Sequence, residues 1–191
     1  ERASALYNAV SAAARANDVA KAKDAMAQLA DKYGGTGYAP RAALLVTPLL
    51  FESGDKAGAK AQLAWVIDND AEDELKQIAR LRLAAILFDD KQYDDALRTL
   101  DAKHDDAFAG IYADLRGDIL AGAGRKAEAR TAYQSALTRL DAKSPYRNFV
   151  QVKLDTLGGA VAAAGVGAPG AVAPPAPGPV TAAGTAAAPP K

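Results

Sequence analysis

An alanine recurs along this chain at intervals of 37, 37 and 33 residues, and this repeat constrains the fold more than any other feature. A large apolar residue stands four positions after each alanine, and a turn-forming pair precedes it by five and four positions. A period of this length predicts a stacked array of helix hairpins. The alanines are Ala22, Ala59, Ala96 and Ala129, followed by Met26, Leu63, Leu100 and Tyr133, and preceded by Asn17-Asp18, Gly54-Asp55, Lys91-Gln92 and Gly124-Arg125.

The repeat resembles that of tetratricopeptide-type hairpins, in which a small residue lets two helices approach and a large one fills the gap. We predict an all-α fold, a tetratricopeptide-like right-handed solenoid of about four helix hairpins plus a C-terminal capping helix. The fourth repeat, Gly117 to Ala136, fits best, although Ala113 stands where the consensus has tryptophan. We expect helices at about 2–16, 19–33, 38–53, 56–69, 72–90, 93–101, 106–122, 125–140 and 146–157.

Local signals predict where several helices begin and end. Asp18, Asp55 and Ser144 are typical N-cap residues, and Pro145 follows at an expected first helical position. Pro48 falls inside the third helix, where a missing N–H is expected to kink it.

Composition divides the chain after Leu157. Residues 158–191 contain 13 Ala, 7 Gly and 7 Pro, with Lys191 as their only charge. So few large apolar groups cannot offset the entropy of an ordered chain. We predict a tetratricopeptide-like repeat domain at 1–157 and a disordered Ala/Pro/Gly-rich tail at 158–191, acting as a spacer or as a docking peptide.

The overall charge and the absence of cysteine exclude several functions. Without cysteine the chain has no disulfide, no thiolate metal ligand and no cysteine nucleophile. Lys and Arg balance Asp and Glu at 23 each, so neither a nucleic-acid partner nor an anionic membrane surface is expected. No apolar run is long enough for a convincing membrane-spanning helix. The chain begins with Glu1, so we expect a processed product or a fragment whose anchor or signal segment lies upstream.

No residue pattern indicates catalysis, a cofactor or a metal. Residues 68–79 begin like a calcium loop, but Asp73 replaces the required glycine and Ala79 the required glutamate. The glycine pair Gly122 and Gly124 lacks the preceding strand of a dinucleotide site. His104 is the only histidine, without a partner for a metal or a triad. We therefore expect no enzyme and no cofactor; a hydrolase using Asp/Glu pairs is a remote alternative.

The first helix of each hairpin is expected to line an inner, concave surface. Placing the helices on the alanine anchors predicts a groove that is apolar along most of its length and acidic at its C-terminal end. Such a groove suits a protein segment with apolar anchors and a basic end, unless several of these side chains belong to the core. The predicted groove residues are Tyr7, Arg41, Leu44, Phe51, Ile78, Leu81, Phe88, Ile111, Asp114 and Asp118, with Pro48 beside them.

The order of several segments resembles the YfgM-like ancillary subunit of the bacterial Sec translocon over about residues 1–157. The segments are Gly54-Asp55-Lys56-Ala57-Gly58-Ala59, Leu81-Arg82-Leu83-Ala84, Ala96-Leu97-Arg98-Thr99-Leu100-Asp101, Ala113-Asp114-Leu115-Arg116-Gly117-Asp118 and Ala127-Glu128-Ala129-Arg130-Thr131-Ala132-Tyr133.

The resemblance implies one N-terminal transmembrane helix, absent from this chain, and a repeat domain on the periplasmic face of the inner membrane. It implies partners in the Sec translocon and a membrane-anchored periplasmic chaperone of the PpiD type, and it brings no catalytic residues. We therefore expect a non-enzymatic protein-interaction module. A scaffold of outer-membrane assembly or cell-wall coordination is the alternative.

Overall fold

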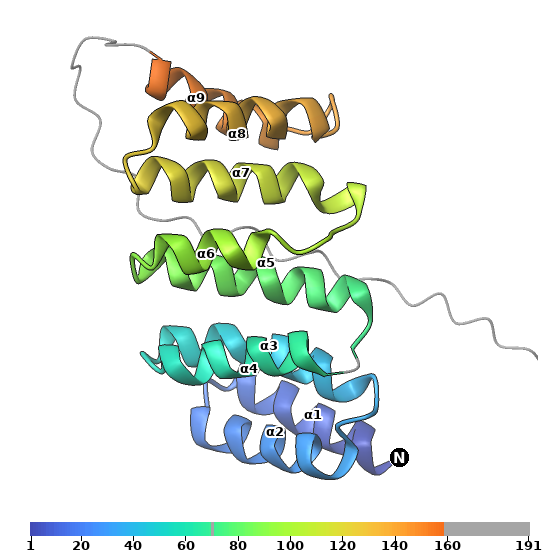
Figure 1. Cartoon of the computed structure of the whole chain (residues 1–191). Helices are drawn as coiled ribbons and strands as arrows, with labels where there is room; N and C mark the ends of the chain where they lie inside the picture. The colour runs from blue at the N-terminus through green and yellow to red at the C-terminus, as the bar shows by residue number, and fades with distance from the viewer. Residues whose placement is uncertain (70, 159–191) are drawn as a thin grey trace, which may run out of the picture. The chain divides into compact units, whose positions relative to one another are not determined.

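The fold is all-helical in the part of the chain that the computed structural model describes, residues 1–69 and 71–158. These residues form nine α-helices and no strand, which confirms the predicted tetratricopeptide-like fold class (Figure 1). Each predicted helix end lies within one residue of the observed one. The helices are α1 (Arg2–Arg15), α2 (Val19–Tyr33), α3 (Tyr38–Glu52), α4 (Lys56–Asp68), α5 (Asp73–Asp89), α6 (Tyr93–Leu100), α7 (Asp106–Gly122), α8 (Lys126–Arg139) and α9 (Tyr146–Gly158).

The predicted tail lies outside the described residues, apart from Gly158, which is the last residue of α9.

The turn inside each hairpin has the same backbone design. The residue five positions before each repeat alanine has a left-handed conformation, with φ between 53° and 88°. The next N–H donates to a carbonyl five residues back, as Asp18 N does to Ala13 O at 2.9 Å, and this pattern recurs in all four turns. Both features define a Schellman motif, which ends a helix and satisfies its last carbonyl groups. The left-handed residues are Asn17, Gly54, Lys91 and Gly124.

The residue after each left-handed position is the N-cap of the next helix. Asp18 accepts a hydrogen bond from Lys21 N at 3.1 Å, and Asp55 accepts one from Gly58 N at 2.8 Å. The predicted caps at Asp18 and Asp55 are therefore confirmed. The Ser144 hydroxyl accepts from Tyr146 N at 3.3 Å. Helix α9 begins at Tyr146, so Pro145 lies just before the helix and not at its first position as predicted.

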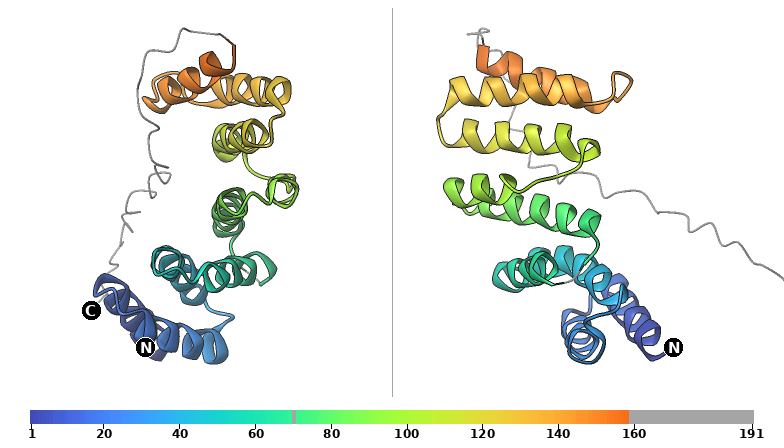
Figure 2. Two further views of the ribbon diagram at one scale, coloured as in Figure 1. Left: turned by 90° about the vertical axis from the view of Figure 1, so that its left-hand side faces the viewer. Right: turned by 45° about the vertical axis from the view of Figure 1, so that its right-hand side comes forward.

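The hairpins stack so that the odd-numbered helices lie on one side and the even-numbered helices on the other (Figure 2, left). Helix α3 packs against α1, α2, α4 and α5, and α7 packs against α5, α6 and α8. The four repeat alanines and the large residues that follow them are all buried, as the repeat predicts.

Two apolar clusters form the core, and both draw on α5. The first contains residues of α1 to α4 together with Ala79 and Ile86 of α5. The second contains Ala84 of α5 with residues of α6 to α9. Helix α5 is therefore the element through which the two halves of the stack share a core.

Candidate protein-binding face

Helix α3 exposes a single stripe of side chains, because its other sides are covered by four neighbouring helices. The exposed residues are spaced by three or four positions, as expected for one face of a helix. We call the surface formed by this stripe and its counterparts on the other odd-numbered helices the odd-helix face. The α3 stripe consists of Tyr38, Arg41, Leu45, Pro48 and Glu52.

The exposed large apolar side chains of the described residues are all on odd-numbered helices. None is on α2, α4, α6 or α8, whose apolar residues face the core. Apolar groups gathered on one face of a repeat array are typical of a surface that binds another protein. These residues, with their exposed fractions, are Tyr38 at 43%, Leu45 at 36%, Ile111 at 39%, Phe149 at 66% and Val152 at 64%.

The predicted groove residues differ widely in exposure. Ile111 and Arg41 are exposed, whereas Leu44 is only 7% exposed and belongs to the first core cluster. Along α3 the exposed stripe passes through Leu45 and Glu52, one residue beyond the predicted Leu44 and Phe51. The half-buried members are Tyr7, Phe51, Ile78, Leu81 and Phe88. No contact in the structure tests binding by these residues, so their role stays a prediction.

The two predicted acidic residues at the C-terminal end are engaged within the fold. Asp114 is buried, and it accepts hydrogen bonds from the Tyr146 hydroxyl and, at 3.0 Å, from Lys153 Nζ. Asp118 accepts bonds from Lys153 Nζ at 2.8 Å and from the Tyr133 hydroxyl at 2.7 Å. These carboxylates therefore connect α7 to α8 and α9, and Lys153 offsets one of their two charges.

The electrostatics of this cluster follow from its burial. Burial and then the charge of Asp114 raise the pKa of Asp118, and Lys153 and Tyr133 only partly oppose this. Burial alone would lower the pKa of Lys153, but Asp118 and Asp114 outweigh it and raise that pKa. Burial, together with hydrogen bonds to the carboxylates, also raises the pKa of Tyr133 and Tyr146.

Pro48 frees a backbone carbonyl on α3, and Arg82 of α5 binds it. Proline has no N–H, so the carbonyl of Leu44, four residues earlier, has no helical donor. Arg82 Nη1 donates to Leu44 O at 2.7 Å. This bond explains how α3 tolerates an interior proline, and it joins α3 to α5, the helix that both core clusters share.

Gln77 of α5 holds the connection between α6 and α7. Its buried side chain donates to Asp105 Oδ2 at 2.8 Å and accepts from Asp105 N at 2.7 Å. Tyr112 donates its hydroxyl to Gln77 O at 2.8 Å, and the ring of His104 stacks on Tyr112 at 4.2 Å. His104 thus lies in the connection between the third and fourth repeats, as predicted, and its ring packs on Tyr112. This packing accounts for the histidine without a ligand.

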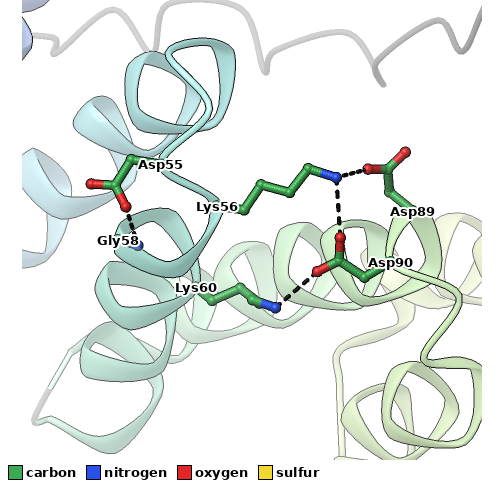
Figure 3. Close-up of polar contacts among 6 residues, drawn as sticks. All are labelled: Asp55, Lys56, Gly58, Lys60, Asp89 and Asp90. Atoms are coloured by element: carbon green, nitrogen blue, oxygen red, sulfur yellow. Dashed lines mark hydrogen bonds and ion pairs between the residues drawn. The ribbon is translucent and has the colours of Figure 1, made fainter.

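Ion pairs join successive repeats near the hairpin turns. Lys56 Nζ contacts both Asp89 and Asp90, and Lys60 Nζ lies 2.8 Å from Asp90 Oδ2 (Figure 3). Lys23 Nζ similarly lies 2.9 Å from Asp55 Oδ2. Each pair connects the second helix of one hairpin to the turn of the next, so together they link the first three repeats.

The described surface offers no metal site and no membrane-spanning helix. No group of three His, Cys, Asp or Glu side chains within residues 1–69 and 71–158 could hold a metal ion. No helix in the same part of the chain is both long and apolar enough to cross a membrane. Two shallow hollows lie between α1 and α2 and among α4, α5 and α6, and no predicted groove residue lines them.

The repeat architecture decides the family. Residues 1–159 match the family described as a tetratricopeptide repeat-like domain. The chain belongs to this family. The match ends one residue beyond the last residue of α9.

Two relatives of this tetratricopeptide-like chain carry the name ancillary SecYEG translocon subunit. The protein of Neisseria gonorrhoeae is 29% identical over 157 residues, which cover 82% of this chain and 75% of the relative. The protein of Escherichia coli is 32% identical over 120 residues, which cover 63% of this chain and 58% of the relative. The resemblance to the YfgM-like subunits is therefore confirmed, although this chain spans little more than half of the Escherichia coli protein.

A solved structure shares the fold of this tetratricopeptide-like domain. MamA from Desulfovibrio magneticus RS-1, from residue 41 to its end, superimposes with a TM-score of 0.58 at 21% identity. The superposition covers 83% of this chain and 90% of MamA, and it supports the fold alone.

Proposed function

We propose that this chain is a non-enzymatic protein-interaction module that binds protein segments on its odd-helix face. The observation that carries the proposal is the distribution of large exposed apolar residues: Tyr38, Leu45, Ile111 and Phe149 lie on odd-numbered helices, and no such residue of the described chain lies on an even-numbered one. The two hollows described above contain none of these residues, and we propose that the partner lies across the face.

The partner we propose is the SecYEG translocon. Relatives that match most of the folded domain are ancillary subunits of that translocon. We further propose that the domain works at the periplasmic face of the inner membrane, held by an N-terminal anchor outside this sequence. There it would link the translocon to a membrane-anchored chaperone of the PpiD type.

Site-specific photo-crosslinking in the native membrane tests this function. A photoreactive amino acid replaces Leu45, Ile111 or Phe149 on the odd-helix face, and Ala61 or Gln134, exposed on α4 and α8, as matched controls. We expect the odd-helix positions to capture SecYEG subunits or the chaperone, and the controls to capture neither. Capture at the control positions alone, or no capture of either partner, would overturn the proposal.

A further inference from the structure

We propose that the part of the odd-helix face around Arg82 binds a carboxylate next to an apolar side chain, so that the partner segment is acidic and apolar. This inference rests on the proposed function, because it specifies the chemistry of what that face binds. The proposed partner segment is acidic, whereas Asp114 and Asp118 in the sequence predict a segment with a basic end.

Arg82 has more hydrogen-bond donors than its one bond to Leu44 O uses. A guanidinium carries five N–H groups, and the bond to Leu44 O uses one of them. Arg82 forms no ion pair with any residue of 1–69 or 71–158. Its positive charge is therefore uncompensated by the described part of the chain.

The surroundings of Arg82 are apolar. The repeat spacing of 37 residues places Arg82 at the position equivalent to Leu45, so both belong to the odd-helix face. Leu45 and Pro48 are exposed beside the bonded Leu44 carbonyl, and Ile78 lies one helical turn before Arg82. Burial lowers the pKa of Arg82, although a guanidinium stays charged at neutral pH. A partly dehydrated cation gains more from a carboxylate than a fully hydrated one does.

Two other cations on the odd-numbered helices, Arg41 and Lys153, already have anionic partners. Arg41 binds Glu72 through both carboxylate oxygens, at 2.9 and 3.0 Å. Lys153 is held by Asp114 and Asp118. Arg82 differs because its partner is a neutral carbonyl. Charge complementarity on this face therefore favours a segment that brings a carboxylate, which can bind a guanidinium through two parallel hydrogen bonds.

The test must separate the structural bond of Arg82 from the proposed binding role. Pro48→Ala restores an N–H that can donate to Leu44 O, so in this background Arg82 is no longer needed to satisfy that carbonyl. We therefore compare Pro48→Ala with Pro48→Ala/Arg82→Met. Equal free energies of unfolding for these two variants would confirm that the second remains a fair test of binding.

The probes are three fluorescent peptides with the same leucine-containing sequence, carrying Glu, Gln or Lys at one central position. We expect the native domain and Pro48→Ala to bind the Glu peptide about tenfold more tightly than the Gln peptide, and the Lys peptide least. In Pro48→Ala/Arg82→Met the Glu and Gln peptides should bind equally.

Fluorescence anisotropy measures the three dissociation constants. Equal binding of the three peptides by the native domain, or no binding of any, would overturn the carboxylate inference. So would a Glu preference that survives in the double variant. Crosslinking of SecYEG at Leu45 would still support the proposed function in each of these cases, so the two failures can be told apart.

Discussion

Two of the four left-handed turn residues are not glycine. Asn17 tolerates this conformation better than most residues, because its short polar side chain can bond locally. Lys91 has neither advantage at φ 59°, so the turn of the third hairpin is the most strained of the four. The chain holds this conformation because the Schellman bonds and the packed hairpin fix the turn.

Replacing Lys91 by glycine should stabilise the domain. Relief of left-handed strain is worth roughly 1–2 kcal/mol, whereas the added freedom of glycine in the unfolded chain costs roughly 0.5–1 kcal/mol. We expect Lys91→Gly to raise the free energy of unfolding by about 1 kcal/mol in urea denaturation. Gly54→Ala, at the equivalent position of the second hairpin, should lower it by about the same amount. A loss of stability in Lys91→Gly would contradict this account of the turn.

Asp118 should make the domain less stable as the pH rises. Its folded pKa is raised, so the folded state holds this proton more tightly than the unfolded state does. The stability that it contributes is present below the ordinary pKa of aspartate and is lost as the pH rises through the raised value. Asp118→Asn should therefore gain stability relative to the native chain as the pH rises above about 4.

Urea unfolding across this pH range measures the effect of Asp118. Lys153→Met removes the neighbouring cation, so this variant should lose stability more steeply than the native chain as the pH rises. Asp118→Asn should lack the part of the pH dependence that Asp118 causes. A difference between the native chain and Asp118→Asn that stays constant with pH would show that Asp118 does not titrate in this way.

Helix α7 packs closely on α8 because Gly117 lies against an aromatic ring. A Cβ added at Gly117 would lie 2.4 Å from the ring of Tyr133. The ring cannot move aside easily, because the Tyr133 hydroxyl bonds Asp118 and Lys153 lies over the ring. The fourth repeat thus uses the small-and-large pairing that its sequence indicates.

Gly117→Ala should destabilise the domain despite favouring helix. Overpacking costs roughly 1–3 kcal/mol, whereas alanine in a helix gains about 1 kcal/mol over glycine. We expect a net loss of about 1 kcal/mol in thermal or urea unfolding. Gly117→Ala/Tyr133→Leu, which removes the ring, should recover stability relative to Tyr133→Leu alone. Equal stability of Gly117→Ala and the native chain would show that the helices are not in close contact here.

The helices and their turns could be predicted from the sequence because their causes are local. The Ala22-to-Met26 spacing and the caps at Asp18 and Asp55 act within one or two turns of helix. The exposed stripe of α3 lies one residue beyond the predicted groove positions Leu44 and Phe51, because the alanine anchors do not fix how far the neighbouring helices cover α3.

Contacts between distant residues could not be predicted. Pro48 predicted a kink in the third helix, but it gave no sign of Arg82, which binds the freed Leu44 carbonyl from 38 residues away. The acidic residues Asp114 and Asp118 gave no sign of Lys153, which is similarly remote and reaches them only because α9 packs on the last hairpin. Local patterns therefore predicted the helices but not the side chains from distant parts of the chain that bind these groups.

Stability of the whole stack depends on contacts between neighbouring repeats, because each helix packs mainly on adjacent ones. The Lys23–Asp55 and Lys60–Asp90 pairs add charge contacts to this apolar packing. Lys23 and Gly58 N lower the pKa of Asp55, and Lys60 and Lys56 lower that of Asp90. Both carboxylates therefore favour the folded state at neutral pH.

Acid should weaken these links between repeats. A lowered folded pKa gives stability that is present above the ordinary aspartate pKa and is lost as the pH falls through the folded value. Asp55→Asn/Asp90→Asn, in which the amide oxygen at position 55 can still cap α4, should be less stable than the native chain at neutral pH. The difference should shrink below about pH 4 and in high salt. Urea unfolding at several pH values measures it, and a difference independent of pH and salt would exclude a role for these charges.

The contacts of Lys153 define where the folded domain can be cut. The last hairpin ends at Arg139, which suggests a natural C-terminal boundary there. A chain shortened before Lys153 would leave buried Asp114 beside Asp118 without their cation, and an unpaired buried charge strongly destabilises a fold. An excised version of this domain should therefore keep α9 through Lys153, so the smallest autonomous unit is longer than its four hairpins.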